Sequence, residues 1–84
     1  MEYAGGTVAR SLKGHDFDRL FVIVKTSESF VWLIDGKRRK KHNPKKKNFK
    51  HIEITATYIP EFDSLSDKAL RKKLNRLKKQ YLRR

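Results

Sequence analysis

The sequence predicts a small, mainly β domain that ends in one basic α-helix, and three observations lead to this fold class. Short runs of β-branched and aromatic residues fill the first two thirds of the chain, and these residue types suit a pleated, half-buried surface. Polar residues with Gly or Pro separate the runs, as turns do. Near residue 63 the apolar spacing changes to three and four residues, which is helical. With 84 residues in total, we expect one structural domain.

Four segments have the composition or alternation of strands, and a fifth is an edge strand or a loop because its proline cannot donate to a sheet ladder. The four are residues 7–11, 20–25, 30–35 and 51–58, and the fifth is 40–46. In the last strand we expect one dry face, made of Ile52, Ile54, Ala56 and Tyr58. Four or five short strands close most economically as a small SH3-like barrel, which protects its edges. We assign residues 1–62 to this barrel.

Three connections carry turn signals. The polar segment 13–19 contains Gly14 and is predicted to be a loop. The four residues 26–29 fit a hairpin between the two most apolar runs. Asp35 and Gly36 give the strongest signal, because glycine accepts a positive φ that other residues resist.

Residues 63–84 are predicted to form a basic amphipathic helix. Ser64 or Ser66 can cap its first turn. Its apolar stripe is Leu70, Leu74, Leu77 and Tyr81. The stripe is narrow and has no Trp or Phe, so we interpret it as packing on the barrel or on a partner, rather than on a membrane.

The charge balance points to an anionic partner. Lys and Arg total 22 against nine Asp and Glu, which gives a net charge of +13. Such an excess is typical of proteins that meet a nucleic acid, a membrane surface or an acidic protein. The longest apolar runs have five residues, whereas a membrane-spanning helix needs about 20. We therefore expect a soluble protein without a membrane partner. The lack of cysteine and of a secretory pattern fits a cytoplasmic location.

Nine of the cations lie between Lys37 and Lys50, and no acid lies among them. Solubility is a poor reason for this run, since acidic residues serve solubility better. We interpret the run as a phosphate-facing edge of the barrel, with Lys45–Lys47 exposed. Phe49, at the margin of the run, is the aromatic residue that we expect to stack on an unpaired base.

Two stretches resemble the KOW family. The first comprises Gly6 to Val8, Lys13 to Asp16, Arg19 and the apolar strand 21–24, which together look like a KOW motif. The second is Asp35 to Lys37 followed by residues 44–52, which resembles small bacterial KOW-domain RNA-binding proteins. These proteins are similar to KOW-bearing large-subunit ribosomal proteins of archaea and eukaryotes.

The resemblance covers about residues 6–54 and implies an SH3-like barrel that binds structured RNA without catalysis. It implies ribosomal RNA as the partner, with ribosomal proteins as further partners. This chain has Asp18 where the family pattern has Gly before the basic residue. Asp tolerates left-handed backbone angles better than most residues, although it adds negative charge.

The RNA-binding residues that we predict lie in three segments. They are Lys13, His15 and Arg19 in the first loop; Lys37, Arg38, Arg39, Lys40, Lys41, Lys45, Lys46, Lys47, Phe49 and Lys50 in the basic stretch; and Arg71, Lys72, Arg76, Lys78 and Lys79 in the helix.

We expect neither an enzyme nor a metal or cofactor site. No nucleophile with a base and no glycine-rich phosphate loop is present, and the three histidines lack metal-site spacing. Asp16 and Asp18 are interpreted as loop residues whose carboxylates bind their own backbone, rather than as an acid–base or Mg²⁺ pair. No small-molecule substrate is implied. The alternatives are a protein-interaction module for an acidic partner, a duplex-DNA-binding or transcription-linked factor and, third, a peripheral protein of a membrane surface.

Overall fold

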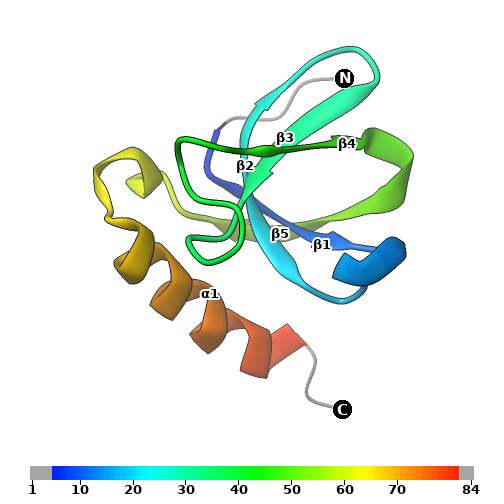
Figure 1. The fold of residues 1–84 in the computed structure, drawn as a ribbon. Coiled ribbons are helices and arrows are strands. Elements are labelled where there is room, and N and C mark those ends of the chain that lie inside the picture. The colour runs from blue at the N-terminus through cyan, green and yellow to red at the C-terminus, as the bar shows by residue number, and fades with distance from the viewer. Residues whose placement is uncertain (1–4, 82–84) are drawn as a thin grey trace.

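The computed structural model describes residues 5–81 and contains five strands and one α-helix (Figure 1). The strands are β1 (Thr7–Ser11), β2 (Leu20–Thr26), β3 (Phe30–Ile34), β4 (Lys45–Asn48) and β5 (Ile52–Tyr58), and the helix is α1 (Asp67–Tyr81). Short 3₁₀ turns at Gly14–Asp16, Phe49–His51 and Phe62–Ser64 lie in the connections. The predicted barrel range includes residues 1–4, and the predicted helix range includes residues 82–84. Both segments lie outside the described residues, as does the side chain of Tyr81.

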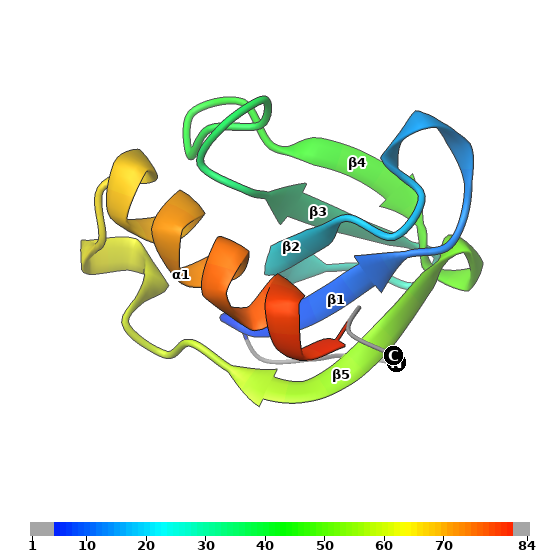
Figure 2. The same cartoon turned by 90° about the horizontal axis from the view of Figure 1, so that it is seen from below.

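The strands form one antiparallel sheet in the order β4-β3-β2-β1-β5. Strands β4 and β5 are its two edges, yet only the turn Phe49–His51 joins them, so the sheet must curl until its edges approach (Figure 2). Two backbone hydrogen bonds hold that turn. Phe49 donates to the carbonyl of Ser29 at 2.9 Å, and Leu12 donates to that of His51 at 2.8 Å. A mainly β, barrel-like fold followed by a helix is thereby confirmed.

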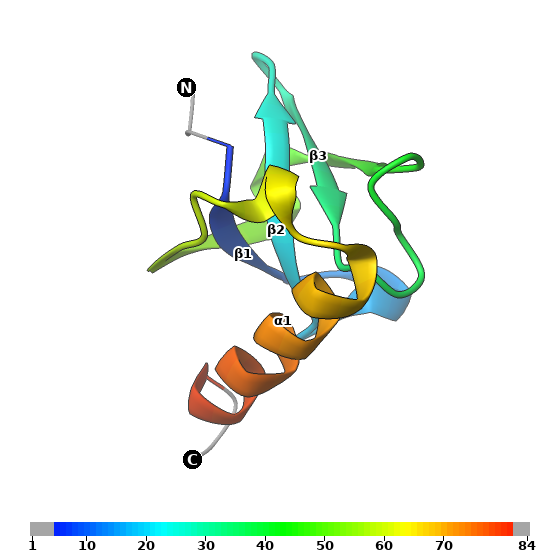
Figure 3. The same ribbon diagram turned by 90° about the vertical axis from the view of Figure 1, so that its left-hand side faces the viewer.

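Strand β2 is buried on both faces, which explains its continuous apolar run. Phe21 and Ile23 point into the curled sheet, where they pack with Val31 and Leu33 of β3. The alternate side chains of β2 point to the outer face. This second cluster comprises Val8, Leu20, Val22, Ile34, Ile59, Phe62, Leu70 and Leu74. Helix α1 therefore covers part of the outer face of the sheet and completes a core that strands alone would leave open (Figure 3).

The cap at Ser66 and the predicted apolar stripe of α1 from Leu70 to Leu77 are confirmed. The hydroxyl of Ser66 accepts a hydrogen bond from the Ala69 amide at 3.1 Å, which satisfies one unpaired donor of the first turn. Leu70 and Leu74 are buried against the sheet, and Leu77 packs beside them. Fully burying a leucine side chain contributes about 1.5–3 kcal/mol. The helix is therefore part of the domain core and not an appendage.

The dry face expected for β5 is wrong in its second half. Ile52 is buried and Ile54 is half-buried, but Ala56 and Tyr58 are exposed. The cause is an irregularity in the pairing with β1, where Thr7 lies opposite Tyr58 and Ala9 lies opposite Ile54. Two extra residues of β5 fit into this interval, so the strict alternation of the sequence does not continue.

The turn after β3 forms as predicted and rests directly on α1. Gly36 has a φ of 76°. A Cβ atom there would collide with the carbonyl oxygen of Asp67 and lie 3.0 Å from the amide nitrogen of Arg71. Gly36 is thus required both by its backbone angle and by its close approach to the helix.

We predict that Gly36→Ala destabilises the protein far more than Gly14→Ala does. Gly14 also has a positive φ, of 80°, but a Cβ there would meet no atom within 4 Å. Gly14→Ala should therefore lower the free energy of unfolding by only the left-handed backbone cost, about 1–2 kcal/mol. Gly36→Ala should lower the free energy of unfolding by roughly a further 1–3 kcal/mol, because its methyl group overpacks the contact with α1. Urea unfolding measures both; equal losses would contradict the close contact between the turn and α1.

Candidate nucleic-acid interface

The segment between β3 and β4, residues 35–44, carries many of the predicted cations, and we call it the basic loop. Its backbone is held by carboxylates. Asp35 is buried, and its Oδ1 accepts hydrogen bonds from the amides of Lys37 and Arg39, both at 2.9 Å. Oδ1 of Asp67, in the first turn of α1, accepts from the amide of Lys41 at 3.0 Å. The carboxylates thus bind the backbone of the loop rather than its side chains.

The side chains of the basic loop differ in their availability. Lys37, Arg38 and Lys40 are exposed, and Arg39 is half-buried. Lys41 has a structural contact instead, because its Nζ donates to the carbonyls of Asp63 at 2.6 Å and Leu65 at 2.7 Å. Lys41 therefore fastens the basic loop to the segment before α1.

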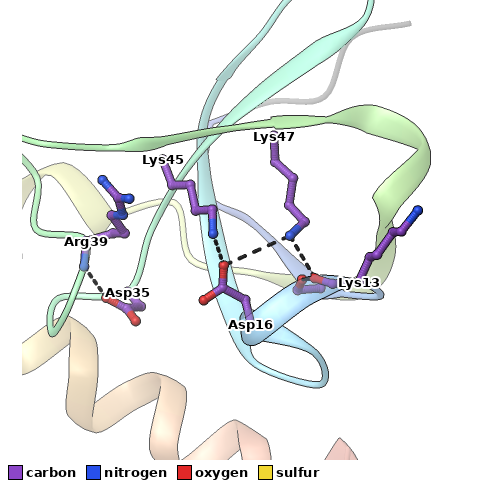
Figure 4. A network of polar contacts seen from close by, with 7 residues as sticks. Lys13, Asp16, Asp35, Arg39, Lys45 and Lys47 are labelled. Atoms are coloured by element: carbon purple, nitrogen blue, oxygen red, sulfur yellow. Dashed lines mark hydrogen bonds and ion pairs between the residues drawn. The ribbon is translucent and has the colours of Figure 1, made fainter.

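The lysine run of β4 does not lie together on one exposed face. The run lies in a strand, so alternate side chains point to opposite faces. Lys45 and Lys47 extend from β4 towards Asp16 (Figure 4). Lys46 lies on the other face of the strand, 4.2 Å from the ring centroid of Phe30. The expectation that all three lysines are exposed is wrong for Lys45 and Lys47, which are partly buried.

Asp16 accounts for this arrangement. Its side chain is 12% exposed, forms an ion pair with Lys45, and lies 4.0 Å from the Nζ of Lys47 (Figure 4). Burial by itself raises the pKa of Asp16, but the hydrogen bond and charge of Lys45, together with Lys47 and Arg19, outweigh it and lower the pKa. Lys47 also donates to the carbonyl of Lys13 at 3.0 Å. Burial and the charge of Lys45 lower the pKa of Lys47.

The interpretation that Asp16 and Asp18 bind their own backbone is also wrong. Asp18 forms an ion pair with Arg10 of β1, and Arg10 in addition bonds Glu53 of β5 at 2.9 Å. Asp18 has a φ of 68°, so it does occupy the left-handed region that its residue type tolerates. The two carboxylates flank Phe17, and each joins the first loop to a different strand.

A groove of about 440 Å³ lies where three predicted binding segments meet. It is lined by the first loop, by the turn at Asp35 and Lys37, and by one face of α1. Its basic side chains are His15, Arg19, Lys37, Arg71 and Lys78. The helical residues Arg71, Asn75 and Lys78 share a face because they are spaced by four and three. Basic residues up to 63 positions apart, from His15 to Lys78, thereby line one concavity.

The other predicted residues lie outside the groove. Lys13 and Lys50 are exposed near the two 3₁₀ turns that flank the barrel end, and Lys72, Arg76 and Lys79 are exposed on α1. Phe49 is half-buried and packs against the interior cluster of the barrel. This packing makes Phe49 a poorer stacking surface than its position in the sequence indicates.

Two aromatic features were not among the predicted binding residues. Phe17 is 58% exposed at the groove. An aromatic residue in a polar loop, outside any strand or helix period, was the signal that could have identified it. On the outer face of the sheet, Trp32 lies under the ammonium groups of Lys25 at 4.5 Å and Lys46 at 5.8 Å from its ring centroid. Such cation–π contacts partly engage these two lysines.

Comparisons with protein-family models and with curated proteins give no match. Within the described residues, no helix is long and apolar enough to cross a membrane. No group of three or more His, Cys, Asp or Glu side chains in residues 5–81 is arranged to hold a metal ion.

We predict that Lys45→Ala and Lys46→Ala have unequal effects on stability, although each removes one lysine from the same strand. Lys45→Ala leaves the largely buried Asp16 without its hydrogen-bonded partner and should lower the free energy of unfolding by about 1–3 kcal/mol. Lys46→Ala removes only the exposed cation–π contacts with Phe30 and Trp32 and should cost less than about 1 kcal/mol. Denaturant unfolding at neutral pH compares them, and a smaller loss for Lys45→Ala would refute the role of Asp16.

Proposed function

We propose that this protein is a non-catalytic RNA-binding protein, and that it binds RNA across the groove side of the domain. The observation that carries the proposal is the convergence of the first loop, the basic loop and α1 on one cationic groove. A net charge of +13 on so small a domain disfavours its own compact state through self-repulsion. A polyanion bound across these segments relieves that repulsion.

The mechanism is electrostatic capture with release of the counterions condensed on the nucleic acid. Lys37, Arg38 and Lys40 supply exposed charge beside the groove. Lysine ammonium groups contact phosphates as flexible point charges, whereas arginine can also grip a phosphate in two places or stack on a base. Helix α1 adds Arg71 and Lys78 to the groove itself. Its other predicted cations, Lys72, Arg76 and Lys79, are exposed on α1 outside the groove. Lys41, Lys45 and Lys47 contribute mainly by holding the fold.

The resemblance to KOW proteins supports ribosomal RNA as the target, and a cytoplasmic location with it. An acidic protein and duplex DNA are the competing partners, since small barrels serve many functions. Nuclease treatment before co-purification distinguishes a protein partner, because association that survives RNA removal does not depend on RNA. Competition between a structured RNA and a DNA duplex of equal length distinguishes the nucleic acids.

We predict that the affinity for a structured RNA hairpin falls steeply with salt. If about six phosphates are neutralised, log K should fall with log salt at a slope of about −4 to −5 between roughly 50 and 200 mM KCl. Lys78→Gln should make this slope shallower by about 1, since it removes one phosphate contact.

The matched control is Lys25→Gln, which removes the same charge at the opposite end of β2 from the groove. This variant should leave the slope nearly unchanged. A wild-type slope near zero rejects electrostatic capture. Equal changes for the two variants would mean that RNA does not prefer the groove side.

A further inference from the structure

Phe17 is a large apolar side chain that the core does not use. It is 58% exposed, and neither buried cluster includes it. It lines the groove together with charged side chains. A single exposed apolar side chain is common on protein surfaces, but this ring lines a concavity among cations, where it suits a ligand with an apolar, flat surface.

The backbone around Phe17 is held rigidly. The amides of Phe17, Asp18 and Arg19 donate to the carbonyls of Gly14, Ser11 and Asp16, at 3.1, 2.8 and 2.9 Å. The neighbouring carboxylates on both sides are fixed by ion pairs, Asp16 to Lys45 and Asp18 to Arg10. A ring presented on such a loop loses little conformational freedom when a ligand binds to it.

The groove is net positive, because four Lys and Arg side chains line it against two acids. Asp18 is paired with Arg10, and Asp35 accepts two backbone hydrogen bonds. Among residues 5–81, by contrast, the side chains of the lining cations form no ion pair or hydrogen bond with an acid. These cations are Arg19, Lys37, Arg71 and Lys78. The site therefore offers cationic donors to an anion that carries several oxygens.

The remaining lining residue of interest is Asn75, whose amide both donates and accepts hydrogen bonds. A nucleotide can make three kinds of contact here. Its base can stack on the exposed ring, the edge of the base can hydrogen-bond to the amide, and its phosphate can contact the unpaired cations. A concavity of about 440 Å³ is in the range of small-ligand sites.

We propose that the groove binds one unpaired nucleotide of the RNA, with its base stacked on Phe17. Arg19, Lys37, Arg71 and Lys78 contact the phosphates on either side of that nucleotide, and Asn75 contacts the base edge. This proposal rests on the proposed function and makes it more specific: the protein selects RNA with a bulge or loop over a continuous helix. In a continuous helix, stacked bases cannot reach the ring.

The test compares two RNA hairpins that differ by one bulged nucleotide, bound by the wild type, by Phe17→Leu and by Tyr58→Leu. Tyr58 is the matched control, since it is 53% exposed but lies on β5 and does not line the groove. We expect the wild type and Tyr58→Leu to bind the bulged hairpin at least about fivefold more tightly, the low end for stacking of one base. Phe17→Leu should lose this preference and keep both its affinity for the paired hairpin and its thermal unfolding midpoint.

Failure of this inference is distinguishable from failure of the proposed function. If the wild type binds both hairpins equally with a steep salt dependence, the RNA-binding function stands and the nucleotide site is refuted. The same conclusion follows if Phe17→Leu weakens both hairpins alike. If AMP competes as strongly as the bulged RNA, the groove is a site for free nucleotides instead. If the wild type binds neither hairpin, both proposals fall.

Discussion

The carboxylates of Asp35 and Asp67 hold the basic loop by accepting hydrogen bonds from its backbone amides. The carboxylates bind backbone amides and not cationic side chains, and this determines which cations of the loop can contact a ligand. Had these acids paired with lysine or arginine side chains, the loop would be ordered but those cations would be held in ion pairs. Because they bind amides, the loop is fixed while Lys37, Arg38 and Lys40 keep their charge at the surface. The backbone of the basic loop is thereby ordered while these three cationic side chains stay exposed.

Helix α1 connects the stability of the fold with the proposed binding surface. Its apolar stripe completes the outer core, and its next face lines the groove with Arg71 and Lys78. The contact of Gly36 with the first turn of α1 places the basic loop beside that face. Because the core of the domain includes α1, the cations of α1 also lie at defined positions. On this account the helix is already folded in the free protein, before RNA binds.

Element types were predictable from the sequence because their signals are local. The helix cap at Ser66, the apolar stripe and the Asp35–Gly36 turn each depend on a few neighbouring residues. Features that depend on distant partners were not predictable. The pairing of Asp16 with Lys45 spans 29 positions, and it withdraws charge from a run that looks uniform in the sequence. Strand alternation alone would have separated Lys46 from its two neighbours. The irregular pairing of β5 with β1 was hidden by a regular alternation, and the groove arises only when the three segments meet.

The most direct test of the central claim is an RNA titration of the isotopically labelled protein, followed by backbone amide chemical shifts. The claim is that the first loop, the basic loop and α1 act as one binding surface. The account predicts that the largest shifts fall in residues 15–20, 35–40 and 71–78, and that they saturate together. The hairpin at residues 26–29 and the exposed end of β5 should change little. Shifts centred on Trp32 and Lys46, or confined to one of the three segments, would contradict the account.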